Sequence, residues 1–90
     1  MITDTDKHII EQLARKYHAK RVVLFGSSLS ATQEYRDIDV AVEGIEGKNF
    51  YAFYGELLCA LSKPVDLVDL SNKKTRFIEL ILREGIPLYA

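Results

Sequence analysis

The stretch that decides the fold is an apolar run that stops abruptly at a small polar pair, Arg21-Val22-Val23-Leu24-Phe25-Gly26-Ser27. A short continuous run rich in β-branched residues is consistent with a strand buried on both faces. Gly26 would let the backbone bend sharply and approach a ligand closely, while the Ser27 hydroxyl and the following amides can donate to an anion. Phosphate oxygens suit such a turn, and an ordinary strand-to-turn glycine is the alternative.

A second strand opens with two carboxylates, in the sequence Asp37-Ile38-Asp39-Val40-Ala41-Val42. Strict alternation places Asp37 and Asp39 on one face, with Cα atoms about 6.5–7 Å apart. With about 5 Å between the carboxylates and an effective dielectric of roughly 20, their repulsion costs roughly 3 kcal/mol. A bound divalent cation reverses that sign, and Mg²⁺ prefers such oxygen ligands. A solvated strand face at a sheet edge is the alternative.

A third carboxylate, Asp66, lies inside the strand-like run Val65-Asp66-Leu67-Val68-Asp69-Leu70. If that strand neighbours the first, Asp66 reaches the aspartate pair from ~4.8 Å away. Three converging carboxylates can hold two metal ions, one on the nucleotide phosphates and one that activates an attacking oxygen. Asp69 could fill the same role, although its place at the strand end is typical of a solvated residue.

The remaining chain alternates between helical periodicity and short apolar runs. It predicts helices at residues 3–20, 48–61 and 71–85. It predicts strands at residues 21–25, 37–42 and 65–70, and a short edge strand at 86–89. Thr3 would cap the first helix, and Ser71 or Asn72 the last. These elements predict a single α/β domain over residues 1–90, with a small mixed β-sheet flanked by helices.

Composition narrows the class of protein. The 90 residues carry 12 Lys+Arg and 13 Asp+Glu, a net charge of −1, which argues against a general nucleic-acid binder. The one cysteine, Cys59, cannot form an internal disulfide, and we expect it to be a small buried side chain. No apolar run approaches the ~20 residues of a membrane span. We therefore expect a soluble cytoplasmic protein without membrane or nucleic-acid partners.

The helix expected at 48–61 carries two adjacent aromatic pairs, Phe50-Tyr51 and Phe53-Tyr54. With a helical period of about 3.6 residues, they cannot all face inward. One or two exposed aromatics make this helix a candidate protein interface. A helix buried on both sides is the alternative.

Taken together, these motifs resemble the minimal nucleotidyltransferases, small stand-alone members of the DNA-polymerase-beta-like superfamily. The resemblance covers essentially the whole chain. It rests on Leu24-Phe25-Gly26-Ser27, Asp37-Ile38-Asp39, Val65-Asp66-Leu67-Val68 and Glu84-Gly85-Ile86-Pro87-Leu88-Tyr89. It implies the nucleotidyltransferase (polymerase-beta-like palm) fold.

The resemblance also implies a role for each motif. Gly26 and Ser27 would hold the β- and γ-phosphates of a nucleotide, and Asp37 and Asp39 would bind Mg²⁺. Asp66 would be the third carboxylate of a two-metal site and would help to activate the acceptor hydroxyl. The implied reaction transfers a nucleoside monophosphate, usually from ATP, to an acceptor and releases pyrophosphate.

The turn after the first strand departs from the family pattern. Commoner members read Gly-Ser-Arg-Ala-Arg-Gly, whereas this chain reads Gly26-Ser27-Ser28-Leu29-Ser30-Ala31. Two cations beside a triphosphate are absent, and charge-assisted contacts are worth about 1.5–3 kcal/mol each. Ser28 and Arg36 are the further candidates for nucleotide binding, with Arg36 as the compensating cation.

Stand-alone members of the family resemble antitoxins that are encoded beside a HEPN-domain toxin, and some add AMP to a tyrosine of that partner. The resemblance therefore implies an antitoxin that modifies a HEPN-type partner. It also implies assembly as a homodimer or a hetero-oligomer as an open possibility. A binding-only antitoxin that neutralises its partner by contact is the alternative favoured by the absent arginines. A small enzyme that modifies an antibiotic ranks lowest.

Overall fold

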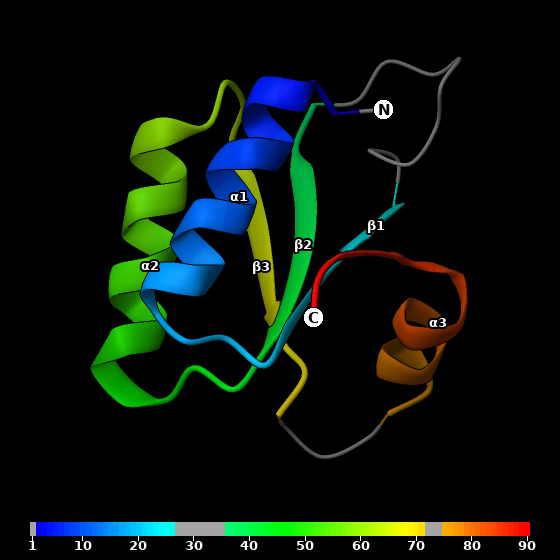
Figure 1. The fold of residues 1–90 in the computed structure, drawn as a ribbon. Helices are drawn as coiled ribbons and strands as arrows, with labels where there is room; N and C mark the ends of the chain where they lie inside the picture. Colours follow the sequence, from blue (N-terminus) through cyan, green and yellow to red (C-terminus); the bar gives the residue numbers. More distant parts are fainter. Residues whose placement is uncertain (1, 27–35, 72–74) are drawn as a thin grey trace.

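The computed structural model describes residues 2–26, 36–71 and 75–90, which form three helices and four strands (Figure 1). In chain order these are α1 (Asp4–Lys16), β1 (Arg21–Phe25), β2 (Ile38–Glu43), α2 (Gly47–Ala60), β3 (Val65–Asp69), α3 (Arg76–Glu84) and β4 (Ile86–Tyr89). The order of elements agrees with the order that the sequence predicts.

The four strands form one mixed sheet in the order β3-β2-β1-β4. β1 is antiparallel to both β2 and β4, and β2 is parallel to β3. β4 is an edge strand, as its proline predicts, because Pro87 has no N–H to donate to a further strand. β2, and not β1, is the neighbour of β3, which sets the position of Asp66 described below.

The helices lie on opposite faces of the sheet, α1 and α2 on one and α3 on the other (Figure 1). Alternate strand residues pack into the two cores, so that Val22 and Leu24 face α1 and α2 while Val23 faces α3. All three side chains are buried, which confirms the expectation of a strand covered on both faces. In β2 the face opposite the larger core buries Ala41 completely, because α3 covers it.

Side-chain hydrogen bonds fix the helix starts. Thr3 caps α1 as predicted, and its hydroxyl accepts from the Asp6 N–H at 3.1 Å. For α3 the expected cap was wrong: the cap is Thr75, whose hydroxyl accepts from the Ile78 N–H at 3.2 Å. Ser71 instead accepts from the Gly44 N–H at 3.3 Å, and the other expected cap, residue 72, lies outside the described residues.

A buried carboxylate ties the first helix to the segment between α2 and β3. Asp6 is 2% exposed, and it accepts from the Ser62 hydroxyl at 2.5 Å and from the Ser62 N–H at 3.2 Å. On the same side, Glu56 of α2 accepts from Lys16 at 2.8 Å and from the Tyr17 hydroxyl. These bonds hold α1 and α2 together above the sheet.

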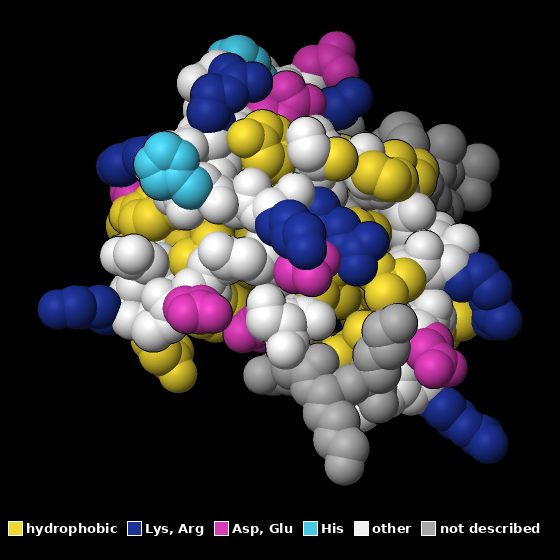
Figure 2. Space-filling model, turned by 60° about the horizontal axis from the view of Figure 1, so that its bottom comes forward, with side chains coloured by type: hydrophobic (Ala, Val, Ile, Leu, Met, Phe, Trp, Pro, Cys, Tyr) yellow, Lys and Arg dark blue, Asp and Glu magenta, His cyan; other side chains and the backbone are white. Residues whose placement is uncertain are grey.

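The surface mixes both signs of charge. Figure 2 shows Lys and Arg side chains interspersed with Asp and Glu over the described part of one face. None of the helices among the described residues is long and apolar enough to cross a membrane.

Candidate active site

The candidate site is a row of side chains that crosses three strands. Phe25 of β1 is the register partner of Asp39 in β2, and Asp39 is the register partner of Asp66 in β3. Register partners present their side chains on the same face of a sheet. Ile38 and Val40, which flank Asp39, face the α1–α2 core. Asp39 and Asp66 therefore project from the face that carries α3.

Asp39 is a carboxylate in this row whose pKa the surroundings change. Its side chain is half-buried, whereas Asp37 and Asp66 are exposed. Burial, the charge of Asp66 and the charge of Asp37, in that order, raise the pKa of the Asp39 carboxyl above its ordinary value. The structure thus brings the three predicted carboxylates into one electrostatic environment, where their mutual repulsion favours a cation.

Asp69, the alternative third carboxylate, does not join this group. It is the register partner of Val42 near the other end of β2, and it accepts from the Ser71 N–H at 2.8 Å. It lies three positions after Asp66, so the alternation of the strand places the two carboxylates on opposite faces. The geometry favours Asp66 over Asp69 as the partner of Asp39.

Gly26 brings the backbone at the end of β1 against the Asp39 carboxylate. Its φ is +72°, a left-handed conformation that side chains rarely adopt, and a Cβ built there would collide with Oδ2 of Asp39. Two features therefore require glycine at this position: the left-handed backbone conformation and the close approach of the Asp39 carboxylate. Ser27 and Ser28 lie outside the described residues, and Arg36 is exposed directly before Asp37.

The carboxylates do not form a closed metal cage. Among the described residues, no group of three or more His, Cys, Asp or Glu side chains is arranged to hold a metal ion. Mg²⁺, however, is commonly bound through one or two carboxylates together with water and substrate phosphates. The half-buried Asp39, with a second carboxylate in register, fits an ion that arrives together with phosphate oxygens.

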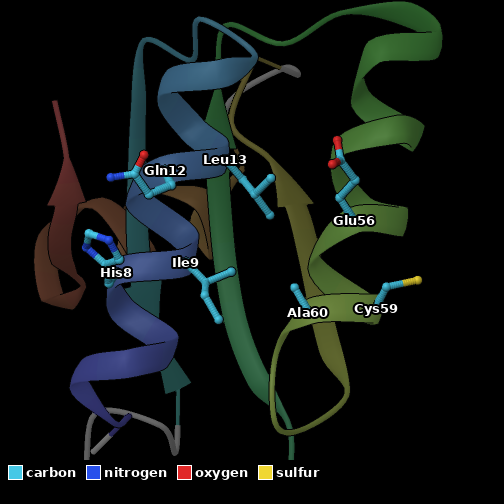
Figure 3. Close-up of a pocket in the computed structure, with 7 residues that line it drawn as sticks. All are labelled: His8, Ile9, Gln12, Leu13, Glu56, Cys59 and Ala60. Carbon is cyan, nitrogen blue, oxygen red and sulfur yellow. The ribbon is translucent and has the colours of Figure 1, made fainter.

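A separate hollow of about 350 Å³ lies between α1 and α2, on the other face of the sheet (Figure 3). Its lining residues are His8, Ile9, Gln12, Leu13, Glu56, Cys59 and Ala60. Cys59 is exposed there, so the expectation of a buried cysteine was wrong: the residue lies on the outer side of α2, away from Phe53 and Leu57. Asp39 and Asp66 project from the opposite face of the sheet.

The expectation that one or two aromatic side chains of α2 are exposed is confirmed, and the interface role stays a prediction. Phe53 is fully buried, whereas Tyr51 is 73% exposed and Leu58 is 44% exposed. The contact of Phe25, the register partner of Asp39, with Phe77 was not predicted from the sequence; the two rings meet edge to face at 5.9 Å. Position 25 directly precedes the Gly-Ser pair, and that adjacency was the available signal.

Several solved structures resemble this one. A chain of a toxin–antitoxin complex with AMP-PNP is 29% identical with a TM-score of 0.76, and the match covers 98% of this chain and 74% of that one. The complex of a tri-AMPylated Shewanella oneidensis HEPN toxin with an MNT antitoxin contains a chain that is 28% identical, with a TM-score of 0.73, and the match covers 94% of this chain and 70% of that one.

The MntA–HepT toxin–antitoxin complex gives 25% identity, a TM-score of 0.75 and coverage of 98% and 73%. The mixed sheet and the helices thus match the polymerase-beta-like fold of MntA. No curated protein matches this chain significantly. The sequence model of the family "Polymerase beta, Nucleotidyltransferase" matches residues 7–90. That match spans almost the whole chain, and the chain therefore belongs to the polymerase beta nucleotidyltransferase family.

Proposed function

We propose that this chain is a Mg²⁺-dependent nucleotidyltransferase that transfers AMP from ATP to a HEPN-type partner protein and thereby acts as its antitoxin. The observation that carries the proposal is the contact between Gly26 and Asp39 beside Asp66, within a chain of the nucleotidyltransferase family. Related complexes support the substrate and the partner, because one holds AMP-PNP and another contains an AMPylated HEPN toxin with an MNT antitoxin.

The proposed roles follow from exposure and position. Asp37 and Asp39 would hold Mg²⁺, which when bound neutralises charge on the phosphate oxygens. Gly26 would leave room for the phosphates because it has no side chain, and Ser27 and Ser28 would bind them through hydroxyl and amide groups. A cation in this region would come from Arg36.

Asp66 would orient the acceptor hydroxyl and accept its proton, since its exposed carboxylate lies in register with Asp39. A bond forms between the acceptor oxygen and the α-phosphorus, the bond from that phosphorus to the bridging oxygen breaks, and pyrophosphate leaves with the electron pair. The residues of this chain thus bind the nucleotide, orient the acceptor hydroxyl and remove its proton.

The test is transfer of radiolabel from ATP labelled at the α-phosphate to a folded HEPN-type partner protein. We expect transfer by the natural chain and at least a hundredfold loss in the Asp39→Asn and Asp66→Asn variants. Asp69→Asn is the matched control, because it changes a carboxylate of the same strand on the opposite face and keeps an oxygen for the Ser71 N–H. Equal transfer by all variants would contradict the assigned roles.

A second candidate is an antitoxin that neutralises its partner by binding alone. Two observations favour it: serines stand at positions 28 and 30, and α2 exposes Tyr51 and Leu58. A variant with Asn at 37, 39 and 66 separates the two functions in a growth-rescue assay. Rescue by this variant would establish neutralisation by contact, and loss of rescue with retained partner binding would establish the enzymatic route.

A further inference from the structure

A second hollow adjoins the candidate site, between α3 and the end of β1. It measures about 300 Å³ and is lined by Phe25, Gly26, Phe77, Leu80, Ile81, Glu84 and Gly85. Its lining is largely apolar, and its volume is at the lower end of the ~300–1,000 Å³ typical of ligand pockets. The space suits a flat ring and is small for a whole nucleotide.

Two apolar side chains of α3 that line this hollow are partly exposed to solvent. Phe77 is 52% exposed and Leu80 is 42% exposed, although both are large and apolar. The ring of Phe77 meets Phe25 edge to face, with an interplanar angle of 83°. This contact orients the two rings relative to each other, and an exposed aromatic ring is a platform on which a nucleobase can stack.

The hollow adjoins the row formed by Phe25, Asp39 and Asp66. Gly26 lines the hollow and at the same time lies against Asp39. Phe25, which also lines it, is the register partner of Asp39. A ligand whose phosphates lie beside Gly26 and Asp39 therefore has this apolar hollow next to it, on the same face of the sheet.

Glu84 adds one polar group to the apolar lining. Its side chain is 65% exposed, and its ion pair with Arg83 is long, at 3.8 Å. A carboxylate at this position can accept a hydrogen bond from an N–H group on the edge of a base. One acceptor beside an aromatic platform is the composition expected of a base-binding pocket.

We propose that this hollow is the nucleobase subsite of the donor nucleotide, with the base stacked on Phe77 and its edge toward Glu84. The inference rests on the proposed function, since it needs the triphosphate at the aspartates. It assigns to α3 a role in binding the donor nucleotide. The chain should then bind a nucleotide more tightly than it binds the triphosphate group alone.

The test compares Mg²⁺·ATP with Mg²⁺·tripolyphosphate, which has no base, by calorimetric titration into the full chain. We expect Phe77→Ala to weaken ATP binding about tenfold and to leave tripolyphosphate binding unchanged. Phe77→Tyr keeps an aromatic platform and should retain ATP affinity. Tyr51→Ala is the control, because it removes a still more exposed aromatic ring from α2 and should change neither affinity.

Each outcome has one meaning. Unchanged ATP affinity in Phe77→Ala, or an equal loss for both ligands, would overturn the base subsite while leaving the proposed donor site in place. Loss of partner binding with full ATP affinity would also overturn it and assign α3 to the protein interface. Failure of the natural chain to bind either ligand would remove the proposed donor site, and the base subsite with it.

Discussion

The substitution Gly26→Ala tests how closely the turn after β1 is fitted to the aspartates. An alanine at φ +72° costs about 1–2 kcal/mol, because its Cβ crowds the backbone in the left-handed conformation. The same Cβ would occupy the space of the Asp39 carboxylate, and moving that side chain off its rotamer adds about 0.5–1.5 kcal/mol. We therefore expect a total loss of about 2–3 kcal/mol in the free energy of unfolding.

Gly47 supplies the matched control, since its φ of +59° is similar and a Cβ there would meet nothing within 4 Å. Gly47→Ala should lose only the backbone contribution of about 1–2 kcal/mol. Urea denaturation measures the difference between the variants, and titration with Mg²⁺·ATP should show weakened binding in Gly26→Ala alone. Equal stability of the two variants, together with unchanged nucleotide affinity of Gly26→Ala, would refute the reasoning.

Two further predictions concern the contacts between α1 and α2. Asp6→Ala leaves the Ser62 N–H and hydroxyl without their buried acceptor. It should lower the free energy of unfolding, measured by urea denaturation, by about 1–3 kcal/mol. Asp4→Ala, at an exposed position of the same turn, should lower it by less. A loss no larger than that of Asp4→Ala would contradict the role of Asp6. The hydrogen bond from Lys16 lowers the pKa of Glu56 below its ordinary value of 4.5. A carboxyl with a lowered folded pKa stabilises the protein above the unfolded pKa, and that contribution is lost as the pH falls through the folded pKa. Thermal melts from pH 6 to pH 3 should therefore show a smaller acid-induced drop in Tm for Glu56→Gln than for the natural chain, and parallel curves would exclude the effect.

The sequence predicted local structure well because each signal is local. The alternation of apolar and polar residues in β2 places Asp39 opposite Ile38 and Val40 whatever the neighbours are. The cap of α3 was mistaken because several residues between 71 and 75 can accept an N-terminal hydrogen bond. In the structure Ile78 and Ile81 pack against the sheet, and Thr75 caps the helix that carries them.

The arrangement of the site was less accessible to sequence analysis because it depends on strand order and register. The pairing of Asp39 with Asp66 follows from the parallel alignment of β2 with β3, which the α2 crossover allows but no residue pattern fixes. The hollow beside α3 likewise depends on the contact of Phe25 with Phe77, which are 52 positions apart, on the face of the sheet that carries α3. The three carboxylates could be named in advance, and their neighbours could not.

The position of β4 beside β1 has a consequence for synthesis on the ribosome. β1 pairs on one side with β2 and on the other with β4, whose residues are made more than 60 residues later. Until β4 emerges, the apolar β1 remains an open edge that invites pairing with another chain. Once in place, the four-residue β4 closes that edge with a proline. Nascent chains that stall before residue 86 are therefore expected to aggregate more readily than the finished domain.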